Sequence, residues 1–304
     1  MARVVFLGTP DAAVPTLDAL VPDHDVGLVV TQPDRPKGRS ATLEAPPVKQ
    51  AAERHGLTVA QPAVTREIAP TIEQAGPFDV GVVVAYGRIL RPDVLALTDH
   101  GYLNVHFSLL PRWRGAAPVA RALMAGDEMT GVTIMKLDEG LDTGPILTAQ
   151  AIDIPDESNA GELTARLAGV GARLLTDILL RYLIGDLEPI PQTDDGVTYA
   201  DKIEKEDRPI DPRSDAVAAV SKVRALAPAP TATLVLDGET HKIHQARLIG
   251  EEVDPGTWIR IGGRAVAGFP GGAVELVTLQ PPGKRPQSGS DWVNGRHTDR
   301  GVIG

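Results

Sequence analysis

Over its first two-thirds the chain alternates short apolar runs with stretches in which apolar residues recur every three or four positions. The short runs predict β-strands at residues 3–7, 26–31, 57–60, 79–85, 102–106, 131–137 and 146–154. The last two strands are expected to pair antiparallel. The periodic stretches predict helices shortly after Pro10 and over residues 47–55 and 159–184. This alternation predicts an α/β fold, a Rossmann-like open sheet with mostly parallel strands.

The last third of the chain has a different pattern. After a stretch rich in Pro, Asp, Glu and Lys, residues Ser214–Leu226 predict a helix with Ser214 as its N-cap. Short strands separated by glycine turns follow as far as Thr278, and they predict a small antiparallel, OB-like β-barrel. We therefore expect three parts, an α/β domain, a linker and a barrel domain, over residues 1–186, 187–207 and 208–304.

Composition and charge narrow the classes of function. The 304 residues include no cysteine, which excludes disulfides and thiolate chemistry and is compatible with a reducing cytoplasm. The N-terminus lacks a leader-like pattern and no apolar run has membrane-spanning length, so we expect a cytoplasmic protein without membrane contact. The net charge of −10 divides into −11 for residues 1–204 and +1 for residues 205–304. A nucleic acid would therefore have to bind at local basic patches.

Candidate chemistry lies where one of the predicted parallel strands ends. Asn104 and His106 are two residues apart, so in an extended strand both side chains point to one side. A later glycine-rich loop offers three carboxylates, Asp138, Glu139 and Asp142. An amide, an imidazole and a carboxylate suit acyl transfer to an amine. The spacing alone leaves open which carboxylate takes part, and also whether the amide and the imidazole merely cap a turn.

Residues 104–118 carry a longer pattern, Asn-Val-His-Phe-Ser-Leu-Leu-Pro-Arg-Trp-Arg-Gly-Ala-Ala-Pro, and further motifs occur at residues 4–10, 31–36, 141–147 and 279–284. Together they resemble the folate-dependent formyltransferases, and most closely the members that act on initiator methionyl-tRNA. Several collinear matches are far more specific than any one short motif.

The resemblance implies that Asn104, His106 and Asp142 form the catalytic set and that 10-formyltetrahydrofolate is the formyl donor. Attack by a neutral α-amine builds negative charge on the formyl oxygen. Asn104 and His106 can each donate a hydrogen bond to this oxygen, and one such donor lowers the barrier by about 3–4 kcal/mol. Asp142 is expected to orient the ring, to stabilise its protonated form and to help move the amine proton.

The same resemblance implies which residues contact the folate. They belong to the turn after His106 and to a segment that follows another strand: Ser108, Leu109, Leu110, Pro111, Ala85, Tyr86, Gly87, Ile89 and Leu90. The residue pattern alone leaves Ile89 and Leu90 equally open to being core residues at the start of a helix. The turn Gly8-Thr9-Pro10 lacks the glycine spacing of a dinucleotide site, and the histidines form no cluster at ligand spacing. We therefore predict neither NAD nor a metal.

For the tRNA, the resemblance implies contacts from the C-terminal barrel and from a basic loop with Arg35, Lys37 and Arg39, of which Arg39 matches the family's key arginine. An arginine in such a loop could read a base edge. A solvated surface loop is the plain alternative. The chain departs from the family where further lysines or aromatic residues are common, at residues 40–42, at Pro212 and over 226–232.

We therefore predict an enzyme, expected to be a monomer, that transfers a formyl group from 10-formyltetrahydrofolate to the α-amine of methionine on initiator tRNA. Residues 1–186 would be its catalytic domain and residues 208–304 its tRNA-binding domain. One alternative is a formyltransferase for a sugar nucleotide or glycinamide ribonucleotide, against which the barrel and the basic loop argue. The other is an RNA-binding protein on a degenerate enzyme domain, against which the intact catalytic set argues.

Overall fold

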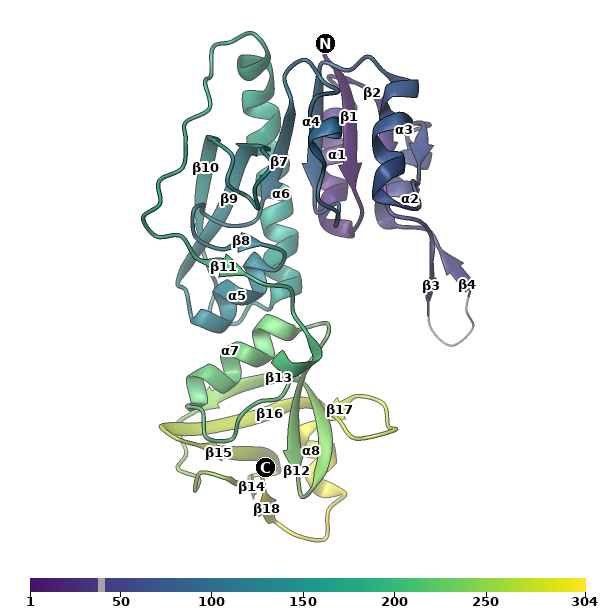
Figure 1. Ribbon diagram of the computed structural model, residues 1–304. Coiled ribbons are helices and arrows are strands. Elements are labelled where there is room, and N and C mark those ends of the chain that lie inside the picture. Colours follow the sequence, from purple (N-terminus) through teal and green to yellow (C-terminus); the bar gives the residue numbers. More distant parts are fainter. Residues whose placement is uncertain (38–41) are drawn as a thin grey trace. The chain divides into compact units, whose positions relative to one another are not determined.

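The computed structural model describes residues 1–37 and 42–304 of the chain. Contacts within the chain divide it into two compact units (Figure 1). The first unit contains residues 1–118, 129–153 and 164–200, and the second contains residues 119–128, 154–163 and 201–304. The second unit thus takes two short segments from the first two-thirds of the chain, which the sequence pattern does not indicate. The expected domain limits at residues 186 and 208 stay a prediction.

A seven-stranded sheet in the first unit confirms the predicted α/β fold, and its strands follow the order β10–β9–β7–β6–β1–β2–β5 (Figure 1). The strands are β1 (Arg3–Gly8), β2 (Asp25–Val30), β5 (Val59–Ala60), β6 (Val80–Val84), β7 (Tyr102–His106), β9 (Met129–Lys136) and β10 (Ile146–Asp153). Neighbours from β5 to β7 pair in parallel. The expected antiparallel pair is present as β9 and β10, and β9 also pairs antiparallel with β7.

Helices cover the sheet because its central strands are apolar on both faces. The helices are α1 (Val14–Leu20), α2 (Pro47–Arg54), α3 (Ile68–Ala75), α4 (Pro92–Leu95) and α6 (Ala160–Leu183), with 3₁₀ turns η1 (Asp11–Ala13) and η2 (Thr65–Glu67). All five residues of β6 and of β7 are buried. Val5 and Leu7 of β1 lie in one cluster with Ile68 and Ile72 of α3. The sheet is thus a packed layer whose strand ends are available for a site.

The long helix α6 approaches β7 and β9 closely through a glycine. A Cβ atom built on Gly171 would lie 2.5 Å from Val105 Cγ1 and 3.3 Å from Val132 Cγ1. Val105 stands between Asn104 and His106 and points to the opposite side of β7. The backbone of α6 therefore supports the strand that carries both candidate residues.

Two short strand pairs lie outside this sheet. Strand β3 (Arg35–Lys37) pairs antiparallel with β4 (Thr42–Glu44). The two ends of the segment expected to be a basic loop are therefore paired strands. Strand β8 (Arg114–Gly115) pairs in parallel with β11 (Tyr199–Ala200). Strand β11 lies within residues 187–207, which the sequence predicts to be a linker. Residues 187–200 of this stretch therefore belong to the first unit, and residues 201–207 belong to the second.

The second unit is the predicted antiparallel barrel. Its strands follow the order β12 (Ala232–Leu236), β13 (Glu239–Ile249), β16 (Gly272–Gln280), β15 (Arg264–Phe269), β14 (Thr257–Ile261) and β18 (Arg300–Val302), and β17 (Gln287–Ser288) pairs with β16. A bridge between Leu236 and Ile303 joins the two ends of this path and closes the sheet. Closure leaves short edges only, which is the advantage of a barrel over an open sheet.

Helices α5 (Pro118–Ala125), α7 (Ala216–Leu226) and α8 (Gly289–Asn294) and the 3₁₀ turn η3 (Lys205–Asp207) complete the chain. The N-cap of α7 is Asp215, whose carboxylate accepts from Ala218 N at 2.8 Å, so the prediction of Ser214 as the cap was wrong by one residue. Ser214 Oγ instead donates to Asp211 O at 2.7 Å. Among the helices of the described residues, none combines the length and the apolar character needed to cross a membrane.

The barrel core contains a buried histidine between polar partners. His241 is fully buried, and its Nδ1 donates to Glu239 O at 2.8 Å, because a carbonyl can only accept. Its Nε2 accepts from Trp292 Nε1 at 3.2 Å. Burial lowers the pKa of His241, and the nearby Arg296 adds to this effect. The ring is therefore held in its neutral form.

Candidate active site

A cavity of about 500 Å³ opens where β6 and β7 end. Val83 of β6 and Asn104 and His106 of β7 line it from the sheet, while Leu137 and Asp142 line it from the loop after β9. Strands β6 and β7 pair in parallel, so their carboxyl ends meet at one edge of the sheet. Ligand sites of open α/β sheets lie outside this edge.

The three residues expected to form the catalytic set come together in this cavity. Asn104 Nδ2 donates to Asp142 Oδ1 at 3.4 Å, and His106 Nδ1 lies 3.7 Å from Asp142 Oδ2. The side chains of His106 and Asp142 are only 6% and 12% exposed. Electrostatic interactions are stronger in such a poorly hydrated site than in water. The group can therefore act on a bound substrate through one amide, one imidazole and one carboxylate.

The other two carboxylates of the loop have different surroundings. Asp138 Oδ1 accepts from Gly140 N at 3.0 Å and from Thr143 Oγ1 at 2.7 Å, so this carboxylate closes its own turn. Glu139 is exposed. Asp142 is the carboxylate that faces His106, which is the choice that the residue spacing leaves open.

Asp142 has a backbone conformation that is unusual for a side chain with a Cβ atom. Its φ is +52°, in the left-handed region. Gly115 N donates to Asp142 Oδ2 at 2.8 Å, and Gln192 Nε2 donates to Asp142 O and to Gly144 O, both at 2.8 Å. At Gly144 a Cβ would lie 1.8 Å from Lys136 O, so the loop passes too close to β9 for any other residue. Hydrogen bonds thus hold both the carboxylate and the backbone carbonyl of Asp142.

The ring of His106 is oriented by a backbone carbonyl. His106 Nε2 lies 2.9 Å from Trp113 O, which can only accept, so Nε2 carries a proton and donates it. Nδ1 is then the nitrogen that faces Asp142. Trp113 itself has a φ of +64°, and its N donates to Thr198 Oγ1 at 2.9 Å. The loop after β7 therefore turns back to fix the ring.

The segment after β6 forms a wall of the cavity. All five residues that the resemblance assigns to the folate from this segment line it: Ala85, Tyr86, Gly87, Ile89 and Leu90. Ile89 is 74% exposed, whereas Leu90 is buried in the same cluster as Val94 of α4. Leu90 therefore also belongs to the core, and Ile89 does not.

The turn after β7 lies away from the cavity wall. Among the described residues that line the cavity, none comes from the segment Ser108, Leu109, Leu110 and Pro111. Ser108 Oγ donates to Arg112 O at 2.6 Å, and Leu110 N donates to Thr133 Oγ1 at 3.1 Å. These bonds fix the turn against β9. The contact of Ser108–Pro111 with a folate stays a prediction.

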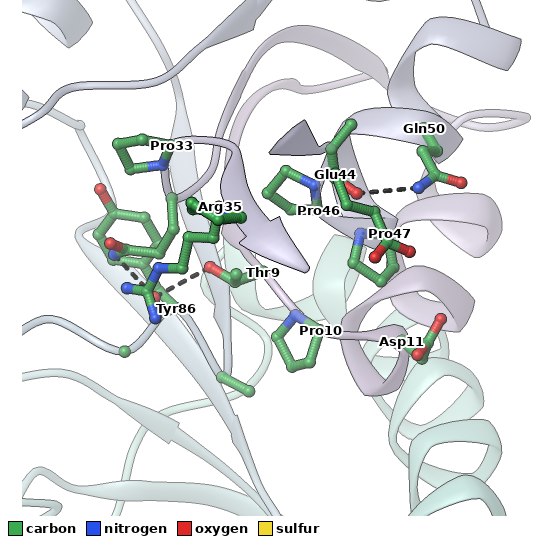
Figure 2. A pocket seen from close by; sticks show the side chains of 15 residues that line it. Thr9, Pro10, Asp11, Pro33, Arg35, Glu44, Pro46, Pro47, Gln50 and Tyr86 are labelled. Carbon is green, nitrogen blue, oxygen red and sulfur yellow. Dashed lines mark hydrogen bonds between the residues drawn. The ribbon is translucent and has the colours of Figure 1, made fainter. Parts of the chain in front are cut away.

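A second cavity, of about 740 Å³, shares Ala85, Tyr86 and Gly87 with the first (Figure 2). Thr9 Oγ1 and Gln32 Nε2 both donate to Tyr86 O, at 3.0 and 3.2 Å, so the ends of β1, β2 and β6 are tied together beneath it. In Figure 2, Arg35 and Tyr86 lie on one side of this cavity, and Asp11 and Gln50 lie on the other, toward the helices. Two adjacent cavities can hold a donor and an acceptor side by side.

The hairpin β3–β4 borders the second cavity. Arg35 and Glu44 are opposite each other in the hairpin, and both line the cavity. Lys37 is the last residue of β3, and Arg39 lies outside the described residues. The hairpin is anchored at its base, where Gln61 and Lys49 donate hydrogen bonds to Asp34 and lower the pKa of its carboxyl.

Several residues around the site have roles that the sequence analysis does not assign to them. Gln192 stands alone in a stretch of Pro and Asp residues, and Trp113 and Tyr86 act through backbone carbonyls. Thr9 and Gln32 belong to motifs shared with the formyltransferases, so the resemblance could have indicated them. Across residues 1–37 and 42–304, no group of three or more His, Asp or Glu side chains is arranged to hold a metal ion.

Comparison with known proteins shows the family of the chain. A family model described as Formyl transferase matches residues 2–179, and one described as Formyl transferase, C-terminal domain, matches residues 202–297. The chain therefore belongs to the formyl transferase family. Among its relatives, the methionyl-tRNA formyltransferase of Halorhodospira halophila is 50% identical over 303 residues, covering 97% of this chain and 96% of the relative. The methionyl-tRNA formyltransferase of Chloroflexus aurantiacus is 44% identical over 312 residues, covering 99% of each.

Solved structures share the fold at low sequence identity. WlaRD, a sugar 3N-formyl transferase solved in the presence of dTDP and 5-N-formyl-THF, has a TM-score of 0.67 at 15% identity, covering 94% of this chain and 99% of that one. The N-formyltransferase from Helicobacter canadensis, in complex with folinic acid and dTDP-3-aminofucose, has a TM-score of 0.69 at 17% identity, covering 92% and 100%. At such identities the likeness concerns the fold alone.

Proposed function

We propose that this protein transfers the formyl group of 10-formyltetrahydrofolate to the α-amine of methionine on initiator tRNA. The observation that carries the proposal is the meeting of Asn104, His106 and Asp142 in one poorly hydrated cavity. Its support from known proteins is that end-to-end relatives at 44–50% identity are methionyl-tRNA formyltransferases. The enzyme would act as a monomer. It would work in the cytoplasm, where tRNA is charged and where a reducing environment is compatible with a chain without cysteine.

The chemistry requires that one N–C bond forms while another breaks. The lone pair of the methionine α-amine attacks the formyl carbon, and the formyl oxygen takes up negative charge. The second N–H of the Asn104 amide, which makes no hydrogen bond with the described residues, can donate to that oxygen. The N10–formyl bond then breaks, and N10 of tetrahydrofolate takes the proton that the amine has lost.

The proton can travel through His106. Nε2 donates its proton to Trp113 O, so the neutral ring has no N–H left for the formyl oxygen, unlike the expectation from the sequence. Nδ1 is then the nitrogen that can take a proton from the attacking amine. The Asp142 carboxylate, 3.7 Å from Nδ1, would stabilise the charged ring until the proton passes to N10. His106 would thus act first as a base and then as an acid, and Asp142 would orient the ring and balance its charge.

We assign one of the two cavities to each substrate. The cavity that contains Asp142 would hold the pterin end of the folate between the wall Ala85–Leu90 and the loop after β9. The neighbouring cavity, which Arg35 borders, would admit the methionyl end of the tRNA. The β3–β4 hairpin, with Arg35, Lys37 and Arg39, and the barrel would contact the tRNA backbone. Arginine and lysine side chains are suited to phosphate contacts.

The experiment that tests this function compares acceptors. Initial rates of formyl loss from 10-formyltetrahydrofolate are measured with methionyl initiator tRNA, with a dTDP-amino sugar and with free methionine. Rapid transfer to the charged tRNA alone is expected. A preference for the amino sugar, the acceptor class of the two solved neighbours, would replace the proposed acceptor while leaving the donor and catalytic set in place.

A further inference from the structure

The segment that follows α6, residues 190–200, contacts two loops of the candidate site. Ile190 pairs with Ile146 of β10, and Tyr199 and Ala200 pair with β8. Between these two anchors, the half-buried Gln192 donates both hydrogen bonds of its amide nitrogen to carbonyls of the Asp142 loop. The sequence pattern marks this segment as a linker, yet its hydrogen bonds go to the loop that carries the candidate carboxylate.

The amide of Gln192 can have only one orientation. Arg114 is buried, and its Nε and Nη2 donate to Gln192 Oε1 at 3.1 and 2.7 Å. An arginine only donates and a backbone carbonyl only accepts, so Oε1 must face Arg114 and Nε2 must face Asp142 O and Gly144 O. Every polar atom of the glutamine side chain is therefore used, and the arginine leaves it no alternative.

The same segment also holds the loop after β7, through hydrogen bonds to Trp113 and Arg114. Thr198 accepts from Trp113 N at its Oγ1 and from Arg114 N at its O, both at 2.9 Å. This holds the short stretch in which Trp113 O accepts from His106 and Gly115 N donates to Asp142. Residues 190–200 thus set the backbone positions that orient both titratable groups.

We propose that Gln192 is a positioning residue for Asp142, acting through its two hydrogen bonds to the loop backbone and itself oriented by Arg114. The inference rests on the proposed function, since it assigns Gln192 a part in the same formyl transfer. The left-handed conformation of Asp142 is unfavourable for a residue with a Cβ atom, so the two hydrogen bonds help to hold it in place. Without them the loop relaxes and its carboxylate moves away from His106.

Two substitutions separate this role from simple packing. Gln192→Met keeps the shape of the side chain and removes its two hydrogen bonds to the loop and the two that it accepts from Arg114. Gln192→Glu keeps an oxygen for Arg114 but places a second oxygen against the two carbonyls. The matched control is Gln74→Ala, an exposed glutamine in α3. For each variant kcat, the KM for 10-formyltetrahydrofolate, the dissociation constant of 5-formyltetrahydrofolate and the urea midpoint are measured beside the unsubstituted protein.

The expected result is a ~10- to 100-fold lower kcat for both Gln192 variants, because a displacement of about 1 Å is enough for such a loss. KM and the affinity for 5-formyltetrahydrofolate should stay close to those of the control in both variants. The urea midpoint should stay close in Gln192→Glu, which keeps an acceptor for the buried Arg114, and should fall in Gln192→Met, which does not. Normal kcat in Gln192→Met would overturn the inference, since packing would then suffice. Normal kcat in Gln192→Glu, or a kcat loss in this variant that follows its urea midpoint, would equally overturn it. Absence of transfer by the unsubstituted protein would instead reject the proposed function.

Discussion

Replacing Asp142 by asparagine removes one charge and the long hydrogen bond of 3.4 Å from Asn104 Nδ2, because the new amide nitrogen only donates. The new amide would keep an oxygen for Gly115 N, so the hydrogen bond of 2.8 Å that ties the two loops survives. The change should therefore alter the free energy of unfolding by no more than about 1 kcal/mol. What disappears is the negative charge 3.7 Å from His106 Nδ1, in a site where both side chains are nearly withdrawn from water.

The size of the catalytic loss follows from this distance. Two unit charges about 4 Å apart interact by about 4 kcal/mol at the effective dielectric constant of about 20 that suits such pairs. If the ring gains its proton during the transfer, losing this interaction raises the barrier by a similar amount, which corresponds to a roughly 1000-fold lower kcat. Steady-state formylation of methionyl initiator tRNA measures the change.

The matched control is Glu139→Gln, in the same loop but exposed. Its kcat should equal that of the unsubstituted protein. A kcat of Asp142→Asn within tenfold of normal would refute the reasoning, because the carboxylate would then carry no essential charge. An equal loss in Glu139→Gln would show that the loop tolerates no change of charge and that the distance to His106 is irrelevant.

Three further outcomes are expected. Gly171→Ala should lower the free energy of unfolding by about 1–3 kcal/mol, since its Cβ would lie 2.5 Å from Val105 Cγ1. Gly169→Ala, in the same helix, meets no atom closer than 3.9 Å and should raise it by about 0.5–1 kcal/mol; urea unfolding that gives both changes one sign would contradict this. Burial lowers the pKa of His241, so the unfolded chain binds its proton more readily and the barrel should lose stability as pH falls below about 6.5. In His241→Gln this loss should shrink, and an unchanged pH dependence of the urea midpoint would argue against it. Arg35→Ala should raise the KM for tRNA and reduce the slope of log KM against log salt concentration by about 1, without affecting kcat. Initial rates at several salt concentrations measure this slope, and an unchanged slope would mean that Arg35 does not contact the tRNA.

The strand that carries the site could be predicted to the residue. Residues 102–106 form an apolar run that is buried on both faces, and β7 has these same limits. The period of two along a strand then places Asn104 and His106 together, as the structure has them. The choice of Asp142 needed the resemblance to a family, because three carboxylates occur in one glycine-rich loop and spacing does not distinguish them.

Short elements were harder to predict, because their stability comes from packing against the rest of the fold and not from their own residue pattern. Helix α3 has eight residues, and Pro70 lies in its first turn, where a proline is tolerated but weakens the helical pattern. The cap of α7 was misplaced because Ser214 and Asp215 are adjacent and both residue types favour the position. The barrel was predictable from its glycine turns, whereas its closure through Leu236 and Ile303 depends on residues far apart in the sequence.

The supporting shell of the site was beyond sequence reasoning for a different reason. Trp113 contributes a carbonyl oxygen, which every residue type has, so no residue pattern can indicate it. Gln192 contributes an amide from a Pro- and Asp-rich segment whose composition is typical of a linker. Such contacts become visible only when the backbone positions are known.

The most direct test of the proposed function identifies the product. Purified protein is incubated with 10-formyltetrahydrofolate and methionyl initiator tRNA. The amino acid is then released from the tRNA by hydrolysis and identified by mass spectrometry. We expect N-formylmethionine, formed in equal amount with tetrahydrofolate, and no formylated product from free methionine or from uncharged tRNA. Recovery of unmodified methionine, in a preparation that binds 5-formyltetrahydrofolate, would contradict the assignment of the acceptor.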